Sequence, residues 1–223
     1  MRTLYHQLLC PFSRAVRIVL GEKKLPFEMV EEHPWDRRED FLRLNPAGEV
    51  PVLVEPDGAV LSDSRSIAEY LDETLPDPPL LGHEPPIRAE VRRLIGWFDG
   101  KFCREVTVPL VGEKLMKRLR RTGDGPDSRL IRAGFTAIHE HISYIGWLAE
   151  ERRWLAGDVF SLADITAASH LSCLDYIGDV PWELSPPAKD WYARVKSRPS
   201  FRPLLADRLS NIPPPKHYSD PDF

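Results

Sequence analysis

The chain has 223 residues, with 30 Lys and Arg against 34 Asp and Glu and a formal net charge of −4. Hydrophobic residues make up 42% of it, enough for a sizeable core in one large domain or two small ones. No run approaches the ~18 apolar residues of a membrane span, and the acidic balance disfavours nucleic acid as a partner. The apolar run at the N-terminus is broken by His6 and Gln7, unlike a secretory signal. We therefore expect a cytoplasmic protein without membrane insertion.

The three cysteines, Cys10, Cys103 and Cys173, are odd in number and far apart in the sequence. Such a set does not suit a disulfide framework, and its spacing does not match a metal site. We expect reduced thiols and no bound metal.

The first 76 residues alternate between strand-like and helix-like segments. We predict strands over 3–6, 27–31, 50–54 and 59–61, and helices over 14–23, over 40–44 and from 64 onward. Asp57-Gly58 is a hairpin signal between the last two strands, so their pairing should be antiparallel. The order β-α-β-α-β-β-α, with Pro51 at the start of the third strand, is typical of an α/β thioredoxin-like domain.

The rest of the chain predicts helices only. A Pro-rich stretch at 77–86 is interpreted as an inter-domain linker, and helix-length segments follow over 87–121, 127–151, 161–175 and 187–197. Ser161 and Asp164 have the spacing of a capping box. We predict an all-α domain over 87–207 and, over 208–223, an extended Pro-rich tail rather than a packed element.

Four segments resemble the glutathione-transferase superfamily, in that family's order. They are CPFSRAVR at 10–17, NPAGEVPVL at 45–53, Asp63-Ser64 ahead of IAEYL at 67–71, and FSLADI at 160–165. The resemblance implies a thioredoxin-like domain at 1–76 followed by an all-α domain. It also implies a homodimer in which the thioredoxin-like domain of one subunit packs on the first long helices of the other.

The same resemblance implies a glutathione site at four residues. The Ser64 hydroxyl and backbone N–H, at a helix start, would bind the γ-glutamyl carboxylate, which the helix dipole also favours. Asp63 would take the γ-glutamyl ammonium. A cis bond between Val50 and Pro51 would let the Val50 backbone pair with the cysteinyl part of glutathione like an added strand. A plain helix N-cap is the alternative interpretation of Ser64.

Cys10 occupies the position where this superfamily often has a Ser or Tyr that activates the glutathione sulfur. A helix N-terminus should lower the pKa of Cys10 and make it a candidate nucleophile; an inert, partly buried thiol is the alternative. Ser13 stands where a dithiol enzyme has its second cysteine. A monothiol exchange is the chemistry expected here, with a Cys10–glutathione mixed disulfide resolved by a second glutathione.

Glu49 is a second departure from the family pattern. The residue before Val-Pro is often basic or amide-bearing there and meets the glycyl carboxylate of glutathione, which Glu49 would repel. We therefore expect glutathione to bind weakly, no cofactor to be required, and the chain not to be an efficient enzyme.

Two segments are not needed for glutathione chemistry and look exposed. One is 31–38, which carries Trp35 among charges of both signs, as in an interaction hot spot; an inter-domain plug is the alternative. The other is the end of the chain, where Asp222 and Phe223 follow a Pro-stiffened stretch that is either a contact or a disordered terminus.

A basic run at 114–121 contains Lys114, Lys117 and Arg118 and suits either a solvated helix end or an acidic partner. Together with the two exposed segments it resembles a branch of the superfamily, the alphaproteobacterial cell-division proteins that bind the tubulin-like FtsZ polymer. That resemblance implies partner contacts at Trp35, in the basic run and at Asp222-Phe223.

Three hypotheses therefore stay open. The first is a non-enzymatic, homodimeric scaffold that binds FtsZ filaments. The second is a glutathione transferase or monothiol thiol transferase that uses Cys10, and the third is a stress or redox sensor based on the same thiol.

Overall fold

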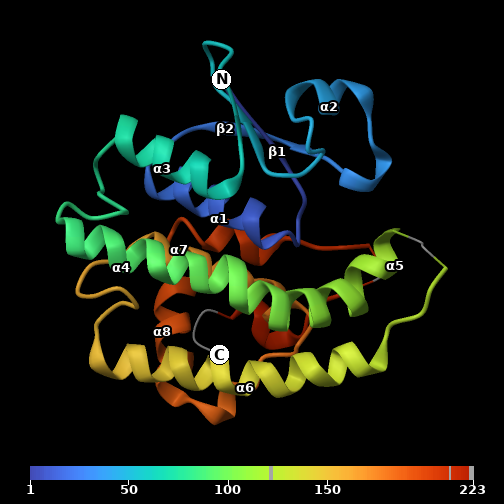
Figure 1. Cartoon of the computed structure of the whole chain (residues 1–223), viewed down its shortest axis with the longest axis vertical. Coiled ribbons are helices and arrows are strands. Elements are labelled where there is room, and N and C mark those ends of the chain that lie inside the picture. The colour runs from blue at the N-terminus through green and yellow to red at the C-terminus, as the bar shows by residue number, and fades with distance from the viewer. Residues whose placement is uncertain (121–122, 211, 221–223) are drawn as a thin grey trace.

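A computed structural model describes residues 1–120, 123–210 and 212–220 and contains a four-stranded sheet beside a larger group of helices (Figure 1). The sheet has the order β2-β1-β3-β4. Its strands are β1 (Arg2–His6), β2 (Phe27–Glu31), β3 (Val52–Val54) and β4 (Val60–Ser62). β1 is parallel to β2 and antiparallel to β3, and β3 is antiparallel to β4. The predicted order of strands and helices along this part of the chain and the antiparallel hairpin are confirmed.

The hairpin closes at Glu55, whose N–H bonds to the carbonyl of Ala59 at 2.8 Å. β3 begins at Val52 and not at the predicted position 50, because Pro51 has no N–H to give to the ladder. The Val50–Pro51 peptide bond is cis, as the resemblance to the glutathione-transferase superfamily implied.

Three helices pack with the sheet. They are α1 (Pro11–Glu22), α2 (Glu39–Leu44) and α3 (Ser64–Thr74). α1 begins directly after Cys10, with Pro11 in the first turn, where its missing N–H removes no bond. Val16, Val19 and Leu20 of α1 are completely buried, so this helix lies inside the molecule and not on its surface.

The second half is helical, as predicted. Its elements are α4 (Pro85–Gly96), the π-helical segment η2 (Trp97–Met116), α5 (Lys117–Arg120), α6 (Ser128–Glu151), α7 (Leu162–Tyr176) and α8 (Pro186–Lys196). The predicted helix over 87–121 is thus α4, η2 and α5 in one run, which crosses the front of Figure 1 above α6. Pro109 lies inside η2, whose turns are wider than those of an α-helix because π-helical hydrogen bonds join residues five positions apart.

α7 is the central helix and is buried along its whole length. The predicted capping box is present at its start: Asp164 accepts hydrogen bonds from Ser161 while the Ser161 side chain accepts from the backbone of Ala163. α7 packs against α1, so the helix that follows Cys10 rests on the centre of the helical half.

The expectation of an extended C-terminal tail is wrong for the described residues after 207. Tyr218 is completely buried, and its hydroxyl donates to the carbonyl of Leu204 at 2.9 Å. Its ring also meets Tyr176 of α7 edge to face, with centroids 5.1 Å apart. Burying one aromatic ring outweighs the extended tendency of the flanking prolines.

The Pro-rich stretch 77–86 is also packed. Leu80 and Leu81 are buried, and their N–H groups donate to Asp72 at 2.8 and 3.0 Å. Lys23 bonds the same carboxylate at 2.7 Å, which neutralises it. Within the described part of the chain, no helix is both long and apolar enough to cross a membrane.

Candidate functional site

Cys10 is the residue that precedes the first turn of α1. Its N–H donates to the carbonyl of Gln7 at 3.2 Å, and its carbonyl accepts the first helical bond from Arg14 at 3.0 Å. Its Sγ atom lies 4.0 Å from the carbonyl oxygen of Val50. The structure therefore brings together the thiol and the cis-Pro loop that the sequence assigned to one site.

The direction expected for the Cys10 pKa is wrong, and the alternative of an inert, partly buried thiol agrees better with the structure. Burial raises the pKa of the Cys10 thiol above its usual 9.0, and this effect outweighs hydrogen bonds from Ser13 and Phe12 that lower the pKa. The sequence indicated the helix N-terminus but not the second domain that covers it. Ser13 is completely buried and accepts a hydrogen bond from the Gln7 N–H at 3.3 Å, so it supports the loop before Cys10.

The candidate γ-glutamyl residues lie at the start of α3. Ser64 is its first residue and is buried, while Asp63 accepts from the Ser66 N–H at 2.8 Å and has a positive φ of 73°. The free N–H groups of this first turn suit a carboxylate. Because Oδ1 of Asp63 caps the helix, its second carboxylate oxygen, Oδ2, is the one left to bind an ammonium group.

Arg37 is a cation near the glycyl end of this site that the sequence did not single out. A Cβ atom on Gly48 would stand 2.8 Å from its guanidinium Nη1, which puts Arg37 beside the exposed Glu49. The Asn45 side chain holds the Glu49 backbone carbonyl at 2.8 Å. A positive charge therefore lies close to Gly48, which directly precedes Glu49 in the chain.

A cavity of about 340 Å³ opens beside Cys10; we call it the Cys10 cavity. Phe12, Cys103 and Val108 line it, and Thr107 adds a hydroxyl. That hydroxyl is 2.8 Å from Nδ1 of the buried His170. Burial raises the pKa of Cys103 to about 11, so neither thiol in this cavity is readily ionised.

A second hollow of about 490 Å³ lies next to the first and is lined in part by Trp35; we call it the Trp35 groove. Trp35 is half-buried and not fully exposed. Its ring stacks on His33, with centroids 4.9 Å apart, and the Arg120 guanidinium lies 5.6 Å from the ring centroid. Such a pair suits cation–π contact. Leu209 and Ser210 of the C-terminal segment complete the wall.

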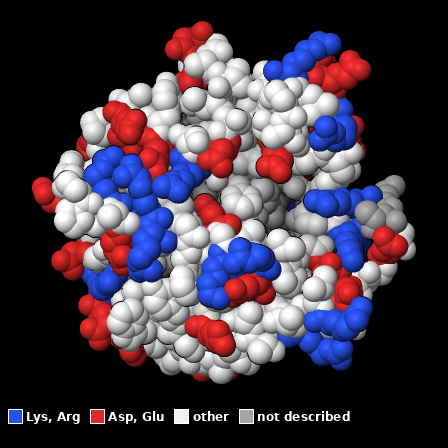
Figure 2. Space-filling view, viewed as in Figure 1, with Lys and Arg blue, Asp and Glu red and all other residues white. Residues whose placement is uncertain are grey.

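Two features that the sequence assigned to a partner therefore meet in space, namely Trp35 and the basic run, through Arg120. In Figure 2 a hollow separates the sheet domain from the helices below, and Lys and Arg side chains gather over α5 at its right-hand end. Gln7, Leu9 and Arg120 line both the Cys10 cavity and the Trp35 groove.

The other predicted contacts have different surroundings. Lys114 forms an ion pair with Asp179 at 2.7 Å, and Lys117 forms one with Glu113 at 2.6 Å. Both lysine charges are therefore partly neutralised within the chain. Arg118 is exposed. Asp222 and Phe223 lie outside the described residues, and their role stays a prediction.

An aromatic patch on the helical half was not anticipated. Trp147 of α6 is 53% exposed and stacks on Tyr144, whose ring also meets Trp97 of η2 at 4.8 Å. Arg93 of α4 donates to the Tyr144 hydroxyl at 3.0 Å. Exposed aromatic rings with arginine are typical of protein interfaces. No group of His, Cys, Asp and Glu within residues 1–120, 123–210 and 212–220 is arranged to hold a metal ion.

Comparison with known proteins matches both halves of the chain. Residues 9–74 match the family model "Glutathione S-transferase, N-terminal domain", and residues 127–199 match "Glutathione S-transferase, C-terminal domain". The chain belongs to the glutathione S-transferase superfamily. The resemblance seen in the sequence and the expected two-part fold are thereby confirmed.

Within this superfamily, the chain is 50% identical over 225 residues to "FtsZ-localized protein A" of Caulobacter vibrioides, covering 100% of this chain and 98% of that protein. The crystal structure of a glutathione S-transferase from Rhodospirillum rubrum has a TM-score of 0.97 and 60% identity, with 100% of both chains covered. The structure of FzlA from C. crescentus has a TM-score of 0.96 and 49% identity, covering 100% of this chain and 99% of that one.

Proposed function

We propose that this chain is a homodimeric, cytoplasmic scaffold of bacterial cell division that binds FtsZ filaments through the Trp35 groove. The observation that carries the proposal is the 50% identity, across the whole chain, to a protein named for its localisation with FtsZ. This identity covers the segments that form the groove.

The state of Cys10 supports a binding role over catalysis. A transferase of this superfamily needs a hydroxyl or an ionised thiol at this position, and burial raises the pKa of Cys10. The Trp35 groove, in contrast, has what a filament surface can use. It offers a half-buried Trp with an Arg over its ring, and the acidic residues Glu31 and Asp36 also line it.

Dimerisation is supported by the aromatic patch of Trp97, Tyr144 and Trp147. A second copy of the chain is the partner proposed for it, because the patch lies on the long helices that form the interface in the superfamily. The neighbouring ion pairs have both signs of charge, with Glu90 bonded to Arg93 and Arg152 at 2.7 Å each, and such pairs can be repeated across a two-fold axis.

Co-sedimentation with FtsZ filaments tests this function. We expect the wild-type chain to pellet with polymerised FtsZ in the presence of GTP and to stay in the supernatant without filaments. Failure to pellet with filaments, in a preparation that is folded and dimeric, would remove the proposal.

Glutathione transfer, or monothiol exchange through Cys10, is the second candidate. It is supported by the buried Ser64 at the start of α3, the cis Val50–Pro51 bond and the 60% identity to a structure described as a glutathione S-transferase. Turnover of a glutathione mixed disulfide that is lost in Cys10→Ala would establish it. Turnover that does not depend on Cys10 would exclude this mechanism.

A further inference from the structure

The C-terminal segment that begins at Asp207 forms one wall of the Trp35 groove. Leu209 and Ser210 line the groove, together with Trp35 and Leu8. Leu8 belongs to the loop between β1 and α1, which leads to Cys10. The groove is therefore built in part from two segments that lie about 200 positions apart in the chain.

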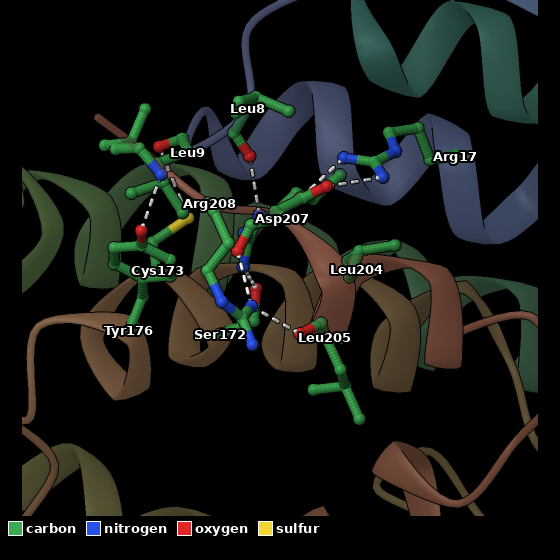
Figure 3. A network of polar contacts seen from close by, with 12 residues as sticks. Leu8, Leu9, Arg17, Ser172, Cys173, Tyr176, Leu204, Leu205, Asp207 and Arg208 are labelled. Carbon is green, nitrogen blue, oxygen red and sulfur yellow. Dashed lines mark hydrogen bonds and ion pairs between the residues drawn. The ribbon is translucent and has the colours of Figure 1, made fainter. Parts of the chain in front are cut away.

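Arg14 connects these two walls. Its side chain is completely buried and donates to three segments: to the Leu8 carbonyl at 2.7 Å, to Ser172 Oγ of α7 at 2.9 Å, and to Asp207 Oδ2 at 3.1 Å. Figure 3 labels the three acceptor residues, Leu8, Ser172 and Asp207, which lie close together between the two helices α1 and α7. Each of the three bonds uses a different nitrogen, so the planar guanidinium fixes the relative positions of all three acceptors.

Asp207 is the matching anion. Besides Arg14 it binds Arg17 in a bidentate pair, at 2.7 and 2.9 Å (Figure 3). Its side chain is only 7% exposed. The buried carboxylate is held between two buried guanidinium groups, because moving it away would leave buried charges unpaired at a large cost in free energy.

Tyr176 of α7 fixes the chain just after Asp207. Its hydroxyl accepts from the Leu209 N–H at 2.8 Å and donates to the Ile212 carbonyl at 2.8 Å. The wall of the groove is thus held at Asp207 by charge and at Leu209 by a neutral hydroxyl.

We infer that Arg14 and Asp207 are positioning residues that set the shape of the Trp35 groove, by locking the Leu8 loop and the Leu209–Ser210 wall to one another. The effect on a partner rests on the proposed function, whereas the locking itself does not. Neither residue lines the groove, so their influence on binding passes through the two walls.

The chain offers a matched control for the ionic bond. Arg198, just after α8, binds Glu22 at the end of α1 through two hydrogen bonds of 2.7 Å. This pair also joins α1 to the C-terminal part of the chain, but neither member lines the Trp35 groove. Its loss should affect stability without affecting the groove.

The first experiment measures amide hydrogen exchange of the full chain in wild type, Asp207→Asn and Arg198→Gln. We expect Asp207→Asn to speed exchange in both walls, at residues 7–10 and at 208–212, and Arg198→Gln to leave both walls unchanged. Faster exchange at 208–212 alone, with residues 7–10 as in wild type, would overturn the coupling.

Arg14→Lys provides a second variant in case Asp207→Asn does not fold. It keeps a positive charge, but a single ammonium group cannot reproduce the three separate bonds of the guanidinium to Leu8, Ser172 and Asp207, so we expect faster exchange at residues 7–10 and at 208–212. If both stretches exchange in this variant as they do in wild type, Arg14 does not lock the two walls and the inference fails.

Filament binding gives the functional readout. In a co-sedimentation titration with FtsZ, we expect Asp207→Asn to bind about five- to tenfold more weakly than wild type, and Arg198→Gln to bind as wild type does. Equal affinity of Asp207→Asn and wild type would refute the effect on the partner. If wild type itself does not bind filaments, the proposed function fails, and the exchange measurement still decides whether the walls are locked.

Discussion

The Sγ atom of Cys10 faces the carbonyl oxygen of Val50 at 4.0 Å, with the cis Val50–Pro51 bond beside it. The carbonyl is an acceptor, so it favours the protonated thiol over the thiolate. Burial acts in the same direction and raises the pKa of Cys10. The position that would hold a catalytic group in a transferase is thus occupied by a thiol kept neutral.

Thiol reactivity follows from these environments. Burial raises the pKa of all three cysteines, that of Cys103 to about 11 and that of Cys173 to about 12. We expect the native chain to react slowly with a disulfide reagent such as DTNB at pH 7.5, and the urea-unfolded chain to react rapidly with three equivalents. If one thiol of the native chain reacts rapidly, and this rapid reaction is missing in Cys10→Ser, then Cys10 is an activated thiol.

Acid stability is expected to depend on His6. Burial, with help from Arg17 and Arg14, lowers the pKa of His6 from 6.5 to about 4. Below pH 6.5 the unfolded chain therefore takes up a proton at this histidine that the folded chain does not. The free energy of unfolding is consequently unaffected by His6 above pH 6.5 and decreases as the pH falls towards 4. The loss should reach about 3 kcal/mol.

Urea denaturation at pH 7 and pH 4.5 measures this effect. His6→Leu should show a smaller loss between the two values than wild type, and the exposed His83→Leu should behave as wild type. If the free energy of unfolding decreases equally in His6→Leu and wild type between these two pH values, groups other than His6 cause the acid sensitivity.

The elements with local signals were predictable from the sequence. Ser161 and Asp164 form their capping box because the bonds join residues three positions apart, and Asp57-Gly58 closes a hairpin for the same reason. The thioredoxin-like order followed from such signals.

Features that depend on contacts between distant residues were not predictable. Tyr218 packs against Tyr176, and Arg120 lies over the ring of Trp35. No pattern in the neighbouring sequence indicates either contact. The pKa of Cys10 was predicted in the wrong direction for the same reason, because the burial that raises it comes from segments far along the chain. The glutathione-like turns could be predicted, but the Trp35 groove could not.

Glutathione binding should respond to Glu49. Removing its charge with Glu49→Gln relieves the repulsion of the glycyl carboxylate, and because the side chain is exposed and screened we expect a gain of about tenfold or less. Calorimetric titration should give weak, millimolar binding for wild type. Low-micromolar affinity of wild type would contradict the assignment of Glu49 as an obstacle.

Dimerisation should depend on the aromatic patch. Trp147→Ala removes a ring that is 53% exposed in the single chain, and we expect it to raise the dimer dissociation constant about tenfold or more if a second copy covers this ring. Sedimentation velocity over a concentration series measures the change. The exposed Val159 provides the control, and Val159→Ala should leave the dimer unchanged; a monomeric wild type would refute the dimer altogether.

The central claim is that the Trp35 groove, and not the Cys10 thiol, performs the function. Co-sedimentation with FtsZ filaments of wild type, Trp35→Ala and Cys10→Ala tests it most directly. We expect Cys10→Ala to pellet as wild type does and Trp35→Ala to bind filaments about tenfold or more weakly. Loss of pelleting in Cys10→Ala together with unchanged pelleting of Trp35→Ala would contradict it.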